Sequence, residues 1–312
     1  MPAFVAKRVL LALPILFGVS VVVFLTIKLI PGDPVSALLG PSATPSARAA
    51  LESRLGLDDP LPVQYLHWAT HAIQGDLGSS ISLQQPAGSL VMTAFGNTLL
   101  LLAAALVIAT VGGVVLGVVM ALRPRGVVGR VISATSLGAI SIPQYTVALL
   151  LLLLAVQTGA FPVGGMHDTG QGGTGDLLAH LALPAIAAAL TPMGIVARMF
   201  SVALAEVLQQ EFVANMRARG LGSRAILRHA MHNALPSLLT ITGLQVGYLL
   251  GGVLFVETIF TWPGLGQLVY GAISSRDMAL IQAGVLVSAV VLVLVNVLVD
   301  TAHAAVDPRV RG

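Results

Sequence analysis

The sequence predicts an all-α integral membrane protein with six transmembrane helices and a large first external segment. The chain has 312 residues, of which 56% are hydrophobic and only 9% are charged. Globular proteins carry about 25% charged residues, so a water-soluble surface is excluded. Long stretches contain no Asp, Glu, Lys or Arg. The basic residues fall in short clusters between apolar runs, a pattern typical of membrane orientation rather than nucleic-acid binding.

Five charge-free windows place most of the spans, because a bilayer-crossing helix needs roughly 20 apolar residues. The windows are 77–122, 131–167, 177–197, 233–256 and 278–299. With the N-terminal run added, the predicted spans lie near Val9–Ile30, Asn97–Leu122, Ile132–Val156, Leu177–Leu204, Leu235–Val256 and Ala279–Val299.

The first apolar run resembles a signal peptide, because Lys7 and Arg8 precede it. However, it is longer than the usual core of roughly 7–15 residues. No small-x-small cleavage site stands before Pro31. These features favour an uncleaved first helix.

Six spans put both termini on one side, and the basic residues indicate that this side is the cytoplasm. That orientation places 12 of the 16 basic residues inside. Those outside are Lys28, Arg48, Arg54 and Arg276. We therefore predict an inner-membrane, multi-pass chain with residues 1–30 as first helix, 31–96 external, and 97–312 as a five-helix core.

The external segment 31–96 is long enough to hold two short helices. Thr44 and Pro45 fit the cap and first position of one, and Gly56 fits the position beyond its end. Residues 62–74 fit a second helix, whose aromatic side chains suit a membrane interface. Two further external loops are predicted, 159–176 with seven Gly, and about 257–277.

Between the fourth and fifth spans lies a cytoplasmic segment with helical periodicity. The fourth span is predicted to continue as helix through Arg219 and to end at Gly220, after which Ser223 caps a second helix. Apolar residues of that helix recur at helical spacing from Ile226 to Ala234, and Arg224 lies on the other face. This pattern fits a basic hairpin lying on anionic lipid. The functional alternative is a short helix that docks into a groove on a cytoplasmic partner.

The residues of this segment resemble a known family. The matching motifs here are Glu211-Phe212-Val213, Arg217 to Leu221, Leu227 to Ala230 and Asn233 to Pro236; elsewhere they include Pro31 to Pro34, Gly75 to Gly78, Ser141 to Pro143, Val256 to Phe260, Trp262 to Gly266 and Asp307 to Arg309. Together they resemble the inner-membrane permeases of the dipeptide, oligopeptide and nickel group of ABC importers, specifically the first, "B"-type permease of the pair.

The resemblance implies a type I ABC importer fold and a mechanism. Two homologous permeases would form the path for peptides, two cytoplasmic P-loop ATPase subunits or domains would hydrolyse ATP with Mg, and an external binding protein would deliver substrate. The coupling loop, about 206–234, would dock through Glu211, Phe212, Val213, Ala214, Asn215, Met216, Arg217, Ala218, Arg219, Gly220 and Leu221. Trp262, Pro263 and Gly264 would contact the binding protein, or alternatively form an interfacial anchor and turn. Met216 departs from the family's usual small Ala, which leaves the docking geometry open.

No catalytic site is expected in this chain. A P-loop needs Gly-Lys-[Ser/Thr], and the only lysines, Lys7 and Lys28, follow Ala6 and Ile27. ATP hydrolysis would therefore belong to partner subunits, with no cofactor here. The seven His residues form no ligand cluster in sequence, so no metal site is predicted. His67 and His71 could share a helix face as ligands, but exposed polar positions explain them more simply.

The main alternative is an ion-coupled secondary transporter of a small solute. Such proteins hold ionisable residues within their spans, whereas here the charges near the membrane, such as Arg198 and Glu257, lie towards span ends. An intramembrane enzyme is less consistent still, because small residues such as Gly112 and Gly117 indicate close helix packing. The exact substrate (dipeptide, oligopeptide, heme, glutathione or nickel) is not written in the sequence.

Overall fold

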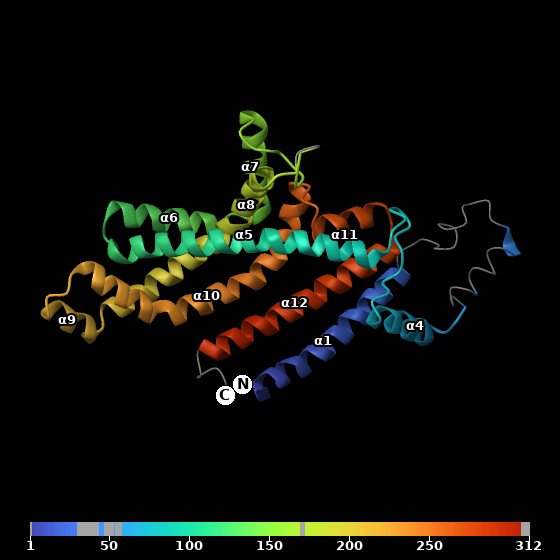
Figure 1. Ribbon diagram of the computed structural model, residues 1–312, viewed down its shortest axis with the longest axis horizontal. Helices are drawn as coiled ribbons and strands as arrows, with labels where there is room; N and C mark the ends of the chain where they lie inside the picture. The colour runs from blue at the N-terminus through green and yellow to red at the C-terminus, as the bar shows by residue number, and fades with distance from the viewer. Residues whose placement is uncertain (1, 30–43, 47–52, 54–57, 169–171, 307–312) are drawn as a thin grey trace. The chain divides into compact units, whose positions relative to one another are not determined.

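The regular secondary structure in the described part of the chain is helical, apart from one isolated bridge between Ser79 and Pro86. The computed structural model describes residues 2–29, 44–46, 53, 58–168 and 172–306 (Figure 1). Its named helices are α1 (Pro2–Leu29), α4 (Leu61–Ile73), α5 (Ala87–Leu122), α6 (Val127–Ser141), α7 (Gln144–Thr158), α8 (Thr174–Leu208), α9 (Glu211–Ala218), α10 (Ser223–Ile259), α11 (Leu265–Ser274) and α12 (Met278–Val306).

Apolar helices stand at all six positions where the sequence predicts spans. Among the described residues, α5, α8, α10 and the Met278–Val299 part of α12 are each long and apolar enough to cross a membrane. The bent pair α6 and α7 passes the same test of length and composition and counts as a fifth span if the two helices are one broken span rather than a re-entrant loop. The apolar stretch of α1 runs over Leu10–Thr26, at the short end of the roughly 17–25 residues that cross a bilayer. The helical membrane fold is thereby confirmed.

The third predicted span is not one straight helix. Instead of running continuously over Ile132–Val156, it is bent by 104° where α6 meets α7 (Figure 1). The cause is Pro143, which disfavours helical geometry in the residue before it. Ile142 is accordingly extended, with φ −87° and ψ 126°. Pro143 therefore separates α6 from α7.

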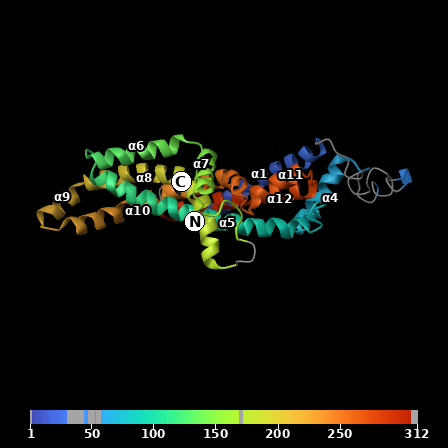
Figure 2. The same cartoon turned by 90° about the horizontal axis from the view of Figure 1, so that it is seen from above.

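The chain divides into two compact units. The larger unit comprises Met1–Lys7, Gly96–Gln267 and Leu294–Gly312. Its centre is α8, which packs against α6, α7 and α10, and Figure 2 shows α8 running between α6 and α10. Buried side chains of α5, α7, α8 and α10 form its main apolar core.

Glycines allow α5 to approach α8 closely in this unit. A Cβ added at Gly113 would lie 2.6 Å from Val196 Cβ, and one at Gly117 would lie 2.8 Å from the Ala197 carbonyl oxygen. Larger residues at these positions would force the helices apart. Close packing through small residues, as the sequence predicts for Gly117, is thus confirmed.

The smaller unit comprises Arg8–Phe95 and Leu268–Val293. In it, α4 packs on α1 through aromatic rings. The ring centroids of Tyr65 lie 6.2 Å from Phe17 and 5.6 Å from Phe24, and those of Trp68 and Phe24 are 5.9 Å apart. The hydroxyls of Ser20 and Tyr65 are hydrogen-bonded at 2.8 Å. These aromatic side chains therefore have a packing role within the chain.

A buried carboxylate fixes the start of α12 in the same unit. Asp277 Oδ1 accepts a hydrogen bond from the Leu280 N–H, as an N-cap does. Its Oδ2 accepts from Ser80 Oγ at 2.6 Å and from the Ser82 N–H and Oγ at 2.9 and 2.8 Å. Burial opposes ionisation of Asp277, but these donors outweigh it and hold the pKa of the carboxyl group below its usual value.

Two elements differ from those predicted, and one short external helix agrees. The helix α5 begins at Ala87, ten residues before Asn97, because no proline or charge interrupts the stretch after Pro86. The helix α11 lies inside the segment predicted as the third external loop. The second short helix, predicted over 62–74, is present as α4. The first, from Thr44 to Gly56, lies largely outside the described residues.

Candidate functional site

The short helix α9 lies in the chain between α8 and α10, two long helices of the larger unit that pack against each other. The sequence predicts that the fourth span continues as helix through Arg219, and this is wrong. The helix α8 ends at Leu208, and Gln210 is extended with φ −70° and ψ 153°. The helix then restarts at Glu211, whose negative charge in the first turn suits the positive end of the helix dipole.

The end of α9 follows from Gly220, as predicted. Gly220 has φ +78°, in the left-handed region that glycine occupies without strain. The Leu221 N–H donates to the Met216 carbonyl at 3.1 Å, and the Gly220 N–H donates to the Arg217 carbonyl at 2.9 Å. These two bonds define a Schellman motif, which turns the chain sharply into α10.

The helix α9 packs on the rest of the chain with one face and exposes the other. Val213 is fully buried, and Phe212 packs on the cluster of Phe200, Leu204, Val207, Ala230 and Ala234. Met216 and Leu221 are half-buried. The remaining residues of the predicted coupling segment are exposed, namely Glu211, Ala214, Asn215, Arg217, Ala218, Arg219 and Gly220. The apolar residues therefore seat the helix, and its small and charged residues form an open surface.

The second predicted helix of this segment is the beginning of α10, which runs unbroken through Pro236 to Ile259. Ser223 is its first residue rather than its cap, since Gly222 holds the cap position without a side-chain bond. The predicted apolar face is confirmed, with Ile226, Ala230 and Ala234 buried.

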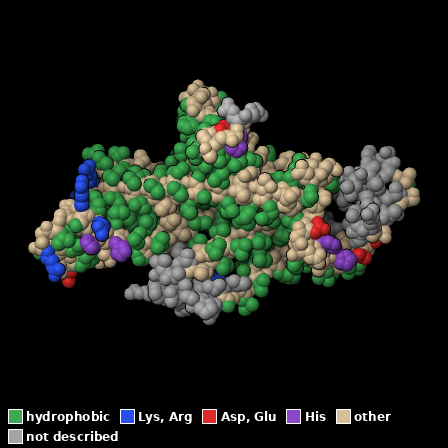
Figure 3. Space-filling model, in the orientation of Figure 1, with side chains coloured by type: hydrophobic (Ala, Val, Ile, Leu, Met, Phe, Trp, Pro, Cys, Tyr) green, Lys and Arg blue, Asp and Glu red, His purple; other side chains and the backbone are tan. Residues whose placement is uncertain are grey.

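The other face of this part of α10 is basic. Arg224, Arg228, His229 and His232 line a hollow of about 610 Å³ together with Leu227, Met231 and Leu235. Figure 3 shows Lys or Arg and His side chains gathered over the part of the larger unit that carries α9. This arrangement provides a cationic surface beside the exposed face of α9.

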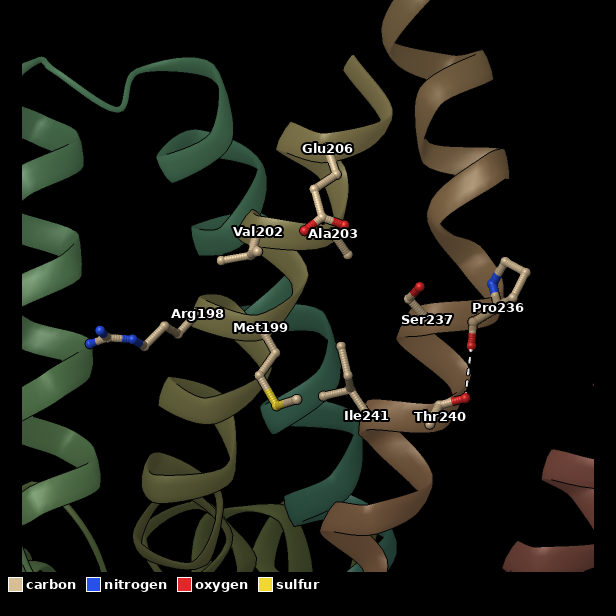
Figure 4. A pocket seen from close by; sticks show the side chains of 9 residues that line it. All are labelled: Arg198, Met199, Val202, Ala203, Glu206, Pro236, Ser237, Thr240 and Ile241. Atoms are coloured by element: carbon tan, nitrogen blue, oxygen red, sulfur yellow. Dashed lines mark hydrogen bonds between the residues drawn. The ribbon is translucent and has the colours of Figure 1, made fainter. Parts of the chain in front are cut away.

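A second hollow, of about 530 Å³, opens between α8 and α10 (Figure 4). The side chain of Met199 points towards Ile241 across the gap, whereas Arg198 points away from it. Ser237 and Thr240 add hydroxyl groups, although the Thr240 hydroxyl donates to the Pro236 carbonyl at 3.1 Å. The hollow is thus mainly apolar, with charge only at its margins.

The loop between α10 and α11 is held rigidly to α5. Glu257 is fully buried, and its Oε1 accepts a hydrogen bond from Thr98 Oγ1 at 2.6 Å while its Oε2 accepts one from the Gly266 N–H at 2.6 Å. Thr98 Oγ1 in turn accepts from the Leu265 N–H at 2.9 Å. A Cβ at Gly264 would overlap the Glu257 carboxyl group, so the loop folds this tightly only with glycine there.

Trp262 does not present a surface for a partner. Its side chain is fully buried, and its Nε1–H donates to the Asn97 carbonyl at 3.0 Å. Asn97 Nδ2 donates to the Pro263 carbonyl at 2.9 Å, and Gly264 is also buried. Only Pro263 of the three predicted contact residues is exposed. Sequence reasoning missed Asn97 and Thr98, because nothing in the sequence pairs them with a loop more than 150 residues away.

These features together define a class of protein. Apolar helices of the larger unit pack around a common core. A short helix between α8 and α10 leaves its small and charged residues exposed, and a basic hollow lies on the neighbouring first turns of α10. This is the architecture of a multi-pass membrane component of a transport system.

The chain belongs to the family described as "Binding-protein-dependent transport system inner membrane component", which matches residues 113–312. Residues 1–98 match the companion description, "Binding-prot-dependent transport system membrane comp, N-term". The chain is therefore an inner-membrane permease component that works with other subunits, as the resemblance implies.

Relatives match along the whole chain. The di/tripeptide transport system permease protein DppB of Pseudomonas aeruginosa is 38% identical over 333 residues, covering 100% of this chain and 99% of the relative. The oligopeptide transport system permease protein AppB of Bacillus subtilis is 35% identical, with both chains covered completely. The glutathione transport system permease protein GsiC of Salmonella choleraesuis is 34% identical over 99% of this chain and 98% of its own length.

A solved structure confirms the fold. The structure described as inward-facing conformations of the MetNI methionine ABC transporter matches with a TM-score of 0.56 and 22% identity. The match covers 70% of this chain and 96% of that chain. This likeness supports the type I importer fold for the matched part of the chain.

Proposed function

We propose that this chain is the permease subunit of an ATP-driven, binding-protein-dependent importer of di- and oligopeptides. The names of the relatives favour peptides, because DppB and AppB at 38% and 35% identity are peptide permeases. The transport path would form with a second, homologous permease. The apolar hollow between α8 and α10, with few charges, suits a passage that tolerates varied side chains.

The coupling mechanism rests on one observation, the division of α9 into a seated face and a free face. Phe212 and Val213 fix the helix to the spans, and Arg217 and Arg219 stand exposed next to the left-handed Gly220. A P-loop ATPase that binds the exposed face of α9 would therefore move α8 and α10 when the ATPase itself moves. ATP and Mg would be bound by two such partner subunits or domains, since the only lysines of this chain, Lys7 and Lys28, follow no glycine.

The orientation follows from the same assignment. If α9 and the basic face of α10 lie in the cytoplasm, both termini lie there as well, as the distribution of basic residues predicts. The loop that carries Pro263 then faces outward, where a binding protein delivers substrate. Because Trp262 and Gly264 are buried, we assign this contact to Pro263 and to the exposed Thr261 beside it.

Reconstitution into vesicles tests the proposal. The chain is purified with the subunits that accompany it, and uptake of a radiolabelled dipeptide is measured with ATP inside and the external binding protein outside. We expect uptake only when ATP and binding protein are both present. Uptake driven by a proton or sodium gradient without ATP would instead support the ion-coupled alternative and refute the proposal.

A charge reversal tests the assignment of α9. Replacing Arg217 and Arg219 with Glu should reduce ATP-driven uptake about tenfold or more, equivalent to about 1.4 kcal/mol of lost docking energy. The matched control reverses Arg123 and Arg130, which are exposed outside α9. Equal loss in both variants would show that the effect is general electrostatics. Full activity of the α9 variant would refute docking at these residues.

A further inference from the structure

Three side chains with metal-ligand chemistry meet where the loop after α7 returns to α8. Asp176 and His180 are four residues apart in the first turns of α8 and share one face of the helix. Asp168 comes from the loop before α8. One ligand atom from each of the three lies within 4.8 Å of the others. The sequence predicts no metal site, because the fold, and not the sequence order, brings Asp168 to this helix face.

The imidazole of His180 is oriented as a metal ligand requires. Its side chain is only 1% exposed. With the ring proton on Nδ1, His180 donates to the Asp176 carbonyl at 3.0 Å. The lone pair of Nε2 then faces Asp168 Oδ1 at 3.6 Å, which is too long for a hydrogen bond. A backbone acceptor that fixes one ring nitrogen so that the other binds metal is the usual arrangement for ligating histidine.

The spacing of these atoms suits a small cation. Ligands 2.0–2.2 Å from a tetrahedral Zn²⁺ lie roughly 3.3–3.6 Å from one another. The Nε2 to Oδ1 separation between His180 and Asp168 already has this value. Asp176 Oδ1 lies 3.2 Å from Nδ1 of the same ring. Because the three ligand atoms are spread over up to 4.8 Å, the Asp176 carboxylate must move inward by roughly 1 Å to complete a tetrahedral site. One imidazole and two carboxylates form a mixed N/O donor set, which suits Zn²⁺ better than Ca²⁺ or Mg²⁺.

Both sides of the cluster are anchored. The Gly165 N–H donates to the Phe260 carbonyl at 2.9 Å and contacts Thr261 Oγ1 at 3.1 Å, which ties the loop to the end of α10. His167 Nδ1 lies 2.9 Å from Asp176 Oδ2. Asp176 is thereby held from a second direction, and an additional imidazole stands beside the site. Asp168, with a side chain 67% exposed, forms the solvent-facing side of the cluster.

We propose that Asp168, Asp176 and His180 bind one divalent transition-metal ion of the Zn²⁺ class as a resident structural ion, with a fourth position for water or His167. The ion links the loop after α7 to α8. The proposal is independent of the transport function, because every ligand belongs to this chain. Its rival is a metal-free clamp in which a protonated His180 pairs with the two carboxylates.

Zinc titration of the complete complex tests the site. The chain is purified with its accompanying subunits, stripped with a chelator and titrated with Zn²⁺ by calorimetry, and Co²⁺ absorption reports the coordination. We expect one more Zn²⁺ per permease in the wild-type complex than in His180→Ala. Because loss of an outer-shell partner alone costs about 10–100-fold, Asp168→Asn, which removes a ligand carboxylate, should weaken binding at least about tenfold. His71→Ala, which removes an exposed histidine of α4, should bind as the wild type does.

Thermal unfolding keeps the test decisive if His180→Ala folds poorly. Asp168 is exposed, so Asp168→Asn should retain the metal-free melting temperature of the wild type. Zinc should then raise the melting temperature of the wild type and not that of Asp168→Asn. Equal zinc binding by the wild type, His180→Ala and Asp168→Asn would overturn the proposal. A wild-type melting temperature that does not respond to zinc, with a pH dependence that Asp168→Asn lacks, would establish the clamp in its place.

Discussion

Replacing Gly264 with alanine tests how strongly the loop between α10 and α11 is held. The backbone of Gly264 does not have positive φ, so alanine carries no conformational penalty there. The only obstacle is steric, because the added methyl group would occupy the place of the Glu257 carboxyl group. To make room, Glu257 must give up its hydrogen bonds from Thr98 and the Gly266 N–H.

The cost can be worked from these two bonds. A hydrogen bond contributes about 1 kcal/mol when neutral and about 1.5–3 kcal/mol when one partner is charged. Loss of both bonds at a fully buried group therefore removes about 3 kcal/mol from the free energy of unfolding. By the scaling for large domains, this lowers the melting temperature by roughly 6–12 °C.

The assay is thermal unfolding of the detergent-solubilised permease at neutral pH, with Gly271→Ala as the matched control. Gly271 lies in α11, and a Cβ there meets no atom within 4 Å. Alanine at this helical position should raise stability by about 0.5–1 kcal/mol. If Gly264→Ala melts at the wild-type temperature, the Glu257 bonds do not stabilise the fold and the reasoning fails.

Three further changes have distinct expected outcomes. Gly220→Ala should lower the free energy of unfolding by about 1–2 kcal/mol, because its left-handed φ disfavours a Cβ, and should slow ATP-driven uptake. Gly222→Ala is the control, because Gly222 has φ −69° and uptake should not slow. Equal uptake in both variants would contradict the role assigned to the Schellman motif. Asp277→Asn should lower thermal stability at pH 7 by about 1–3 kcal/mol. Folding lowers the pKa of Asp277, so the extra stability of the wild type over Asp277→Asn is complete above the usual pKa of 3.8 and is lost as the pH falls through the folded pKa. A stability difference that grows below pH 3.8 would refute this pH dependence. Gln144→Leu should lower the melting temperature of the permease by breaking the 3.0 Å bond to the Ala188 carbonyl beside the α6–α7 bend, a change of about 1 kcal/mol; an unchanged melting temperature would show that this bond contributes nothing.

The approximate places of the apolar spans could be predicted from the sequence, because apolar length and the absence of charge are local properties. The bend at Pro143 and the turn at Gly220 were predictable for the same reason, since each depends on the backbone preferences of one residue. The identity of the coupling segment came from the resemblance, and its docking role stays a prediction.

Contacts between distant segments could not be predicted in this way. Nothing in the sequence says that Thr98 meets Glu257 or that Asp168 meets His180, because these pairs form only when the helices pack. The break after Leu208 was missed because Gln209 and Gln210 are ordinary helix-forming residues. There the packing of Phe212 and Val213 on the spans overrides the local propensity. Trp262 was predicted to lie at a surface, whereas its side chain is buried. The sequence alone does not decide between the two, since an aromatic residue in a loop suits both an interface and a core.

The uninterrupted length of α10 has a mechanical consequence. One helix of 37 residues runs from the turn after α9 to the loop that Glu257 holds by hydrogen bonds. Its length is roughly 55 Å at 1.5 Å per residue. A rod of that length converts a tilt of about 10° at one end into a displacement of roughly 10 Å at the other. Force applied at α9 would therefore reach the opposite end of the helix without crossing a loop, because α10 continues as helix through Pro236 even though proline removes one backbone hydrogen bond there.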